Sequence, residues 1–258
     1  MREAIVGTML GRLATSLRSR WKLSSARLEQ LGQLANDELA GFLVARLCRP
    51  GMMFVDVGAH IGSVVAEVLH HCPNSPIVAV EAVPAKVENL RRRFPSVDII
   101  SCALGEVDGE TSFSVDTVQS GYSTLAERNG SGAEKITVRL HRLDSVICGS
   151  VDVLKIDVEG AELGVLRGGE QLIAKCRPVI MFESGPEEPL HTHADLWQWF
   201  ADRSYDVLVP NRLAHHSAGL SLDSFLDSHV YPRRATNYFA VPVERREEIR
   251  EKAYKLLH

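Results

Sequence analysis

Several features that would assign a protein to a specialised class are missing from this sequence. Its five cysteines are odd in number and widely spaced, and no CxxC pair occurs, which argues against a disulfide framework or a zinc site. No apolar run approaches the length of a membrane span. Basic residues do not exceed acidic ones, since 29 oppose 33 and the net charge is -4, so nucleic acid is not the expected partner. These absences are typical of a cytoplasmic protein with reduced thiols.

The chain does contain a regular alternation of short apolar runs and helical patterns from Gly51 onward. Such an alternation favours an α/β fold with a parallel, doubly wound sheet, and continuous apolar runs are typical of strands covered on both faces. The predicted strands are 52–57, 76–81, 97–102, 151–157, 178–183, 205–210 and 237–242. The predicted helices are 61–71, 84–94, 160–175 and 190–203.

Residues 105–140 depart from this alternation. The turn signal Asp108-Gly109 and the strand pattern over 135–140 predict an added hairpin near 110–140. We expect the sheet domain to span 49–243, preceded by an N-terminal helical segment over 1–48 and followed by a C-terminal helix over 244–258.

The first residues form an amphipathic pattern with a basic border. A helix there would gather apolar side chains on one face, namely Val6, Met9, Leu10, Leu13 and Leu17. We expect this face to pack on the protein's own domain or on a second copy, which would give a homodimer. A peripheral contact with an anionic membrane surface is the alternative, because basic amphipathic helices also bind there.

The turn after the first strand has the composition of a nucleotide-type βα turn. Asp56 ends the strand, and Gly58 and Gly62 let the backbone turn tightly and approach a ligand. The pattern lacks the GxGxxG of dinucleotide sites. An aspartate would repel a phosphate but suits the ammonium and sulfonium of S-adenosylmethionine. Glu81, at the end of the second strand, can accept hydrogen bonds from both ribose hydroxyls.

A second acidic centre follows the fourth core strand, in the stretch KIDVEGAE. Asp157 and Glu183 end neighbouring strands, where ligands bind in open α/β sheets. Glu159 can line the site or only cap the helix that begins at Gly160, and Glu162 is expected on the surface.

If the methyl group of the cofactor is transferred to a hydroxyl, a base or a metal ion must help to remove the hydroxyl proton. We predict Asp157, Glu183 and His191 as the catalytic residues, with the other histidines near the site, His141, His193, His215 and His216, as further base candidates. Asp157 and Glu183 could instead share Mg²⁺, with Ser184 as the adjacent oxygen ligand. Without a metal, Asp157 or a histidine takes the proton and Glu183 orients the acceptor.

Taken together, the segments FVDVGAHIG, AVEAVPAKVENL, CALGEVDG and VDVLKIDVEGAELGVLRGG followed by PVIMFE resemble the FkbM family of S-adenosylmethionine-dependent methyltransferases. The match covers residues 50–185. The resemblance implies a Rossmann-like class I methyltransferase fold with a seven-stranded, mostly parallel sheet whose last strand is antiparallel. It also implies O-methylation of a small-molecule or carbohydrate acceptor, either a sugar or glycan hydroxyl or a natural-product hydroxyl.

The resemblance also implies roles for individual residues. Asp56, Gly58 and Gly62 would line the methionine end of the cofactor, Glu81 the ribose, and Cys102 and Ala103 the adenine. The further cofactor-binding residues would be Ala59, His60, Ala82 and Asp157. Two positions depart from the family pattern: His60 replaces an asparagine, and Ala82-Val83-Pro84 replaces a Pro-x-Pro. A nucleotide-dependent oxidoreductase and a non-catalytic cofactor-binding protein are the alternative functions.

Overall fold

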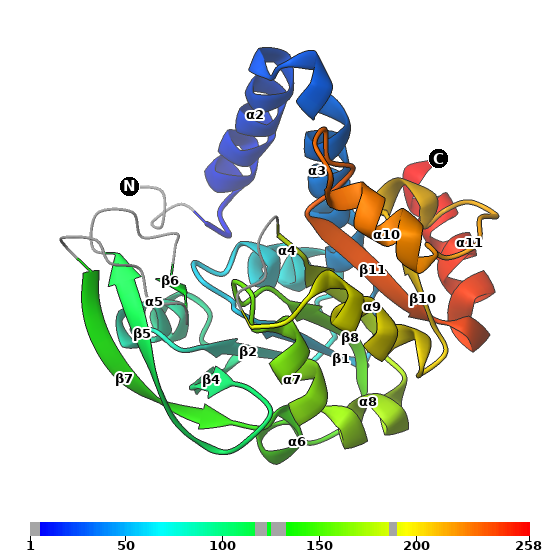
Figure 1. The fold of residues 1–258 in the computed structure, drawn as a ribbon. Helices are drawn as coiled ribbons and strands as arrows, with labels where there is room; N and C mark the ends of the chain where they lie inside the picture. Colours follow the sequence, from blue (N-terminus) through cyan, green and yellow to red (C-terminus); the bar gives the residue numbers. More distant parts are fainter. Residues whose placement is uncertain (1–5, 117–122, 125–132, 186–189) are drawn as a thin grey trace.

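The computed structural model describes residues 6–116, 123–124, 133–185 and 190–258. Its centre is a seven-stranded sheet in the order β10-β11-β9-β8-β1-β2-β3 (Figure 1). The strands are β1 Met53–Val57, β2 Ile77–Glu81, β3 Asp98–Ser101, β8 Val151–Ile156, β9 Val179–Glu183, β10 Tyr205–Leu208 and β11 Asn237–Pro242. All pairs from β9 to β3 are parallel, and β11 is antiparallel to both its neighbours. The predicted fold class is therefore confirmed, including the reversed last strand.

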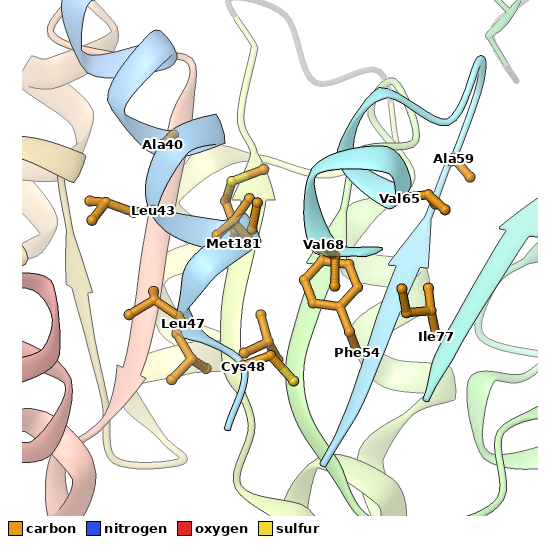
Figure 2. Close-up of a cluster of buried hydrophobic side chains, with 14 of the residues drawn as sticks. Ala40, Leu43, Leu47, Cys48, Phe54, Ala59, Val65, Val68, Ile77 and Met181 are labelled. Carbon is orange, nitrogen blue, oxygen red and sulfur yellow. The ribbon is translucent and has the colours of Figure 1, made fainter. Parts of the chain in front are cut away.

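Helices cover both faces of this sheet, which explains why its strands are apolar throughout. One core forms under α3 (Leu31–Leu47), α4 (Ser63–His71), α5 (Pro84–Arg93) and α11 (Arg246–Leu257). The other forms under α6 (Leu143–Val146), α7 (Glu162–Gly168), α8 (Glu170–Cys176), α9 (His193–Ala201) and α10 (Leu222–His229). Figure 2 shows part of the first core, with side chains of α3 and α4 beside Phe54 of β1 and Met181 of β9.

Successive strand residues point to opposite cores, and this alternation decides where the polar strand ends lie. Phe54, for example, belongs to the first core and Val55 to the second. The polar residues follow members of the first core by two positions: Asp56 follows Phe54, Glu81 follows Ala79, Lys155 follows Val153 and Glu183 follows Met181. The alternation therefore places all of them on one face, at the carboxyl ends of four neighbouring strands.

The predicted helix over 160–175 is interrupted. It is divided into α7 and α8 at Gly169. A Cβ at Gly168 would lie 2.0 Å from the carbonyl oxygen of Gly105, and one at Gly169 would lie 2.6 Å from Leu143. The two glycines thus allow close packing against neighbouring segments, and glycine is also the weakest helix former after proline.

The added hairpin forms a separate small sheet in the order β4-β7-β5-β6. Its strands are β4 Ala103–Leu104, β5 Gly109–Asp116, β6 Ser123–Thr124 and β7 Ala133–His141, with β5 and β7 antiparallel as predicted. Asp108 fixes the base of the hairpin because its carboxylate accepts hydrogen bonds from Arg142 N–H and the Ser145 hydroxyl and pairs with His141. This contact gives the predicted turn residue and His141 a structural role away from the sheet edge.

The N-terminal segment consists of α2 (Met9–Ser25), the 3-10 turn η1 (Leu28–Gln30) and α3. Helix α3 is part of the first core, whereas α2 projects from the body of the molecule (Figure 1). Val6 packs against the core, but Leu13 and Leu17 are each 58% exposed. The prediction that this helix face packs on the protein's own domain is therefore wrong for Leu13 and Leu17. The side chains of Met9 and Leu10 lie outside the described part of the structure.

Candidate active site

A cavity of about 350 Å³ opens at the carboxyl ends of β1, β2 and β8. This volume lies within the range of small-molecule pockets, about 300–1,000 Å³, and the position is the ligand-binding edge of open α/β sheets. The predicted cofactor residues that line it are Asp56, Gly58, Ala59, His60, Glu81, Ala82, Cys102, Ala103 and Asp157. Gly62 does not line it, although the flanking Ile61 and Ser63 do.

The loop between β1 and α4 has three residues with positive φ, Gly58 at 79°, His60 at 51° and Gly62 at 77°. The two glycines are also needed for close packing inside the protein. A Cβ at Gly58 would lie 1.9 Å from the carbonyl oxygen of Asp157, and one at Gly62 would lie 2.3 Å from the Phe94 ring. These glycines therefore hold the loop against β8 and α5, in addition to any close approach to a ligand.

Glu81 is held in place by the backbone of two neighbouring loops. Its Oε2 accepts a hydrogen bond from His60 N–H at 2.8 Å, and its Oε1 accepts one from Val83 N–H at 2.9 Å. The side chain is buried at the cavity wall. Each carboxylate oxygen can accept further hydrogen bonds, so a fixed carboxylate remains available to a pair of ligand hydroxyls.

Asp56 is fully buried, and Lys155 of β8 lies beside it. Lys155 Nζ is 2.9 Å from Asp56 Oδ1 and 3.4 Å from Asp157 Oδ2, and it donates a hydrogen bond to Gly58 O at 2.8 Å. Burial would lower the pKa of Lys155, but the two aspartates outweigh it and raise this pKa, so the ammonium stays charged. The three residues form a buried triad that ties the end of β1 to the end of β8.

Asp157 and Glu183 share one proton. Burial and the neighbouring Asp157 raise the pKa of Glu183 to about 10, so Glu183 is a neutral acid near neutral pH and donates a hydrogen bond to Asp157. Burial opposes ionisation of Asp157, but Lys155 and the hydrogen bond from Glu183 outweigh it and lower the pKa of Asp157. The two carboxyl groups thus adopt opposite protonation states, as in acid–base pairs whose environments separate their pKa values.

Glu159 adds a third carboxyl group to this pair. One oxygen each of Asp157, Glu159 and Glu183 lie within 4.8 Å of one another. Glu159 is partly exposed and has a φ of 54°, and it precedes the loop that leads into α7.

Glu162, expected on the surface, is instead 1% exposed. Its Oε1 accepts hydrogen bonds from Val158 N–H and Gly160 N–H, at 3.0 and 3.3 Å. Glu162 therefore fixes the loop that carries Glu159, just before α7 begins, and the N-cap residue of α7, Ala161, has no side-chain cap.

The candidate histidines separate into two groups. His191 interacts with the backbone of Gly160, and its pKa is lowered, chiefly by burial, so it is a neutral base near neutral pH. His193 Nε2 donates a hydrogen bond to Gly185 O at 2.9 Å, and its ring stacks on His229 with 3.9 Å between ring centroids. His215 and His216 are exposed, and the backbone carbonyl oxygen of His215 accepts a hydrogen bond from the Arg246 guanidinium of α11.

His229 is the histidine of the 209–236 insertion that reaches the strand ends. Its Nε2 is 2.9 Å from the Ser184 hydroxyl, directly after Glu183, and its Nδ1 is 2.8 Å from Phe225 O. Burial, with the nearby His193, lowers the pKa of His229 to about 4. Ser184 is therefore engaged with His229 and is 1% exposed, which does not suit the metal-ligand role suggested for it.

Comparison with known proteins agrees with this arrangement. The model of the Methyltransferase FkbM domain matches residues 56–207, more than half of the chain, including every acid of the site. The chain belongs to the FkbM methyltransferase family. The sequence resemblance is thereby confirmed.

Individual relatives are more distant. Methyltransferase sdnD of Sordaria araneosa is 28% identical over 155 residues, which are 45% of this chain and 60% of that protein. Methyltransferase 1 of Beauveria bassiana is 28% identical over 141 residues, 44% of this chain and 57% of that protein. The crystal structure of Methyltransferase FkbM from Methylobacillus flagellatus KT shares the fold, with a TM-score of 0.51, 16% identity, and coverage of 89% of this chain and 59% of that one. The chain thus spans less than two thirds of the length of these proteins.

Proposed function

We propose that the protein transfers the methyl group of S-adenosylmethionine to a hydroxyl of a sugar, glycan or natural-product small molecule. The observation that carries this proposal is the edge shared by β1, β2, β8 and β9, where Glu81, Asp56, Lys155 and Asp157 line one cavity and Glu183 pairs with Asp157 beside it. The family membership established above supports the reaction class.

The donor side of the cavity suits S-adenosylmethionine, which when bound supplies an activated methyl group on a positively charged sulfur. Glu81 presents a fixed carboxylate to the ribose hydroxyls. Cys102, Ala103 and Leu104 give the cavity an apolar wall suited to adenine. Asp56 Oδ2 is buried and has no hydrogen-bond partner among the described residues, so the triad keeps acceptor capacity beside the β1–α4 loop.

The acceptor side must hold a hydroxyl and remove its proton. The hydroxyl oxygen forms the new bond to the methyl carbon while the carbon–sulfur bond breaks, and the proton passes to a base of the protein. Asp157 and His191 are the bases that the structure offers, because the first is ionised and the second is neutral near neutral pH. Glu183, as a neutral acid, holds Asp157 in place and orients the acceptor by hydrogen bonding.

A divalent ion on Asp157, Glu159 and Glu183 is the second version of this chemistry, favoured by the close approach of their oxygens. We favour the metal-free version because the Lys155 ammonium lies 3.4 Å from Asp157 and already offsets its charge. The positive charge of Lys155 would also repel a metal cation. Activity that vanishes with EDTA and returns with Mg²⁺ would support the ion; activity indifferent to both would support the protein base.

Two carboxylate variants test the proposal. Glu81→Gln should weaken S-adenosylmethionine binding about tenfold or more in calorimetry, because an amide cannot accept from two N–H donors and two ribose hydroxyls. Asp157→Asn should lower turnover far more than binding. Glu251→Gln, an exposed carboxylate on α11, is the matched control and should change neither.

The acceptor class is tested by label transfer from methyl-tritiated S-adenosylmethionine to a panel of sugars, nucleotide sugars and hydroxylated aromatics, beside matched amines. Label on hydroxyl compounds alone would support the proposal. Label on amines alone would contradict O-methylation, and absence of S-adenosylmethionine binding in calorimetry would contradict the cofactor assignment itself.

A further inference from the structure

Helix α2 presents an apolar stripe to solvent. Leu13, Leu17 and Trp21 are spaced four residues apart, so they lie on one helix face, and they are 58%, 58% and 68% exposed. Leu28, just beyond the helix, is 86% exposed. These apolar side chains together form one exposed patch on the helix. Large contiguous apolar patches on soluble proteins usually mark interaction sites.

The charge around this stripe has one sign. Between Val6 and Leu28 the chain carries five basic residues and no acidic residue, although the whole protein has a net charge of -4. The basic residues are Arg12, Arg18, Arg20, Lys22 and Arg27. Arg20 borders the apolar stripe because it is seven residues, close to two turns, after Leu13. The helix therefore combines an exposed apolar face with flanking basic residues.

The position of α2 leaves this face accessible. The helix projects from the sheet domain (Figure 1). Gly7, just before it, lies near the Phe94 ring and Ala66 of α4, and at its other end η1 is linked to the 229–236 loop by a hydrogen bond from the Tyr231 hydroxyl to Glu29. The helix is thus attached to the domain at both ends while the stripe between them faces outward.

We infer that α2 docks on the surface of an anionic lipid bilayer, with Leu13, Leu17 and Trp21 in the interface and the exposed Arg18, Arg20 and Lys22 near lipid phosphates. Charge complementarity selects this occupant: an anionic surface attracts the five cations, whereas a second copy of α2 would bring five like charges against them. Trp21 strengthens the assignment because tryptophan is favoured at the boundary between lipid headgroups and acyl chains. No helix among the described residues is both long and apolar enough to cross the bilayer, so the contact is peripheral.

Vesicle co-sedimentation of the full chain tests the inference without reference to methyl transfer. The protein should sediment with vesicles of phosphatidylcholine mixed with phosphatidylglycerol, not with phosphatidylcholine alone, and less so when salt is raised well above about 0.1 M. Leu17→Glu and the pair Arg18→Glu with Arg20→Glu should each lower the bound fraction at least tenfold. Val107→Glu, at another apolar side chain that is 61% exposed, is the matched control.

Fluorescence of Trp21 gives a second readout. Anionic vesicles should shift the emission to shorter wavelength, and Trp21→Phe should remove this shift, because Trp197 and Trp199 are partly or fully buried in the second core. Equal sedimentation of wild type and Leu17→Glu would overturn the inference. So would a change of solution mass from dimer to monomer in Leu17→Glu without any vesicle binding by the wild type, which would make this face an interface between copies.

Discussion

The proton on Glu183 has a consequence for stability that can be worked out from its pKa. The folded-state pKa of about 10 is far above the ordinary value of 4.5, because Glu183 is buried beside ionised Asp157. Between these two pKa values the folded protein holds one proton that the unfolded chain has released. The free energy of unfolding must therefore fall as pH rises, by about 1.4 kcal/mol per pH unit for one proton.

Glu183→Gln isolates this contribution. The amide keeps the shape of the side chain and can still donate a hydrogen bond to Asp157, but it does not titrate. The difference in unfolding free energy, variant minus wild type, should therefore rise by nearly 3 kcal/mol between about pH 6 and pH 8. Urea unfolding followed by fluorescence at several pH values gives this difference by linear extrapolation.

A control carboxylate should behave differently. A hydrogen bond from Arg177 lowers the pKa of Glu244 to about 2, so this group is ionised in both states throughout the same pH range. The difference for Glu244→Gln should be constant with pH. If the difference for Glu183→Gln were equally constant, Glu183 would be ionised in the folded protein and the shared-proton description would be refuted.

Three further predictions concern the framework of the site. Lys155→Met should cost about 3–5 kcal/mol of unfolding free energy because it leaves buried Asp56 without a cation, and adding Asp56→Asn should recover much of that loss in the same urea assay. Gly58→Ala should lower the unfolding free energy by more than the roughly 1–2 kcal/mol expected from its positive φ alone. The control Gly51→Ala, at a φ of 76° with no atom within 4 Å of the added Cβ, should show only that smaller cost. Equal melting temperatures of the two variants would contradict the predicted clash at Gly58. Glu162→Ala should cost about 1–3 kcal/mol by leaving two N–H groups without an acceptor, and a stability change below that range in calorimetry would contradict its role in fixing the loop.

The sheet could be predicted from the sequence because its strands are buried on both faces. Continuous apolar runs then identify each strand without knowledge of where the helices lie. All seven predicted runs overlap the strands of the central sheet. The break at Gly169 could not be predicted, because it depends on how closely Gly105 and Leu143 approach in three dimensions. Hydrophobic periodicity indicates the secondary structure that a segment prefers, whereas the break depends on contacts with distant parts of the chain.

The site shows the same division. The acids at the strand ends were visible from position alone, but their protonation states depend on Lys155 and on the approach of two strands. Lys155 did give a signal, since a lysine inside an apolar strand is rarely buried without a partner. His229 gave none, because it reaches Ser184 across 45 residues of sequence through the fold of the insertion.

The protonation of Glu183 also bears on the proposed reaction through its charge. Burial raises the pKa of Asp56, whereas the pKa of Asp157 is lowered, so Asp157 presents an ionised carboxylate to the cavity that can attract a cationic cofactor. During methyl transfer the positive charge on sulfur disappears, so negative charge beside it stabilises the starting complex more than the transition state. A second ionised carboxylate next to Asp157 would increase that imbalance, whereas a neutral Glu183 holds Asp157 in place without adding charge. The shared proton therefore lets the strand ends bind a cation while limiting the cost to the transfer step.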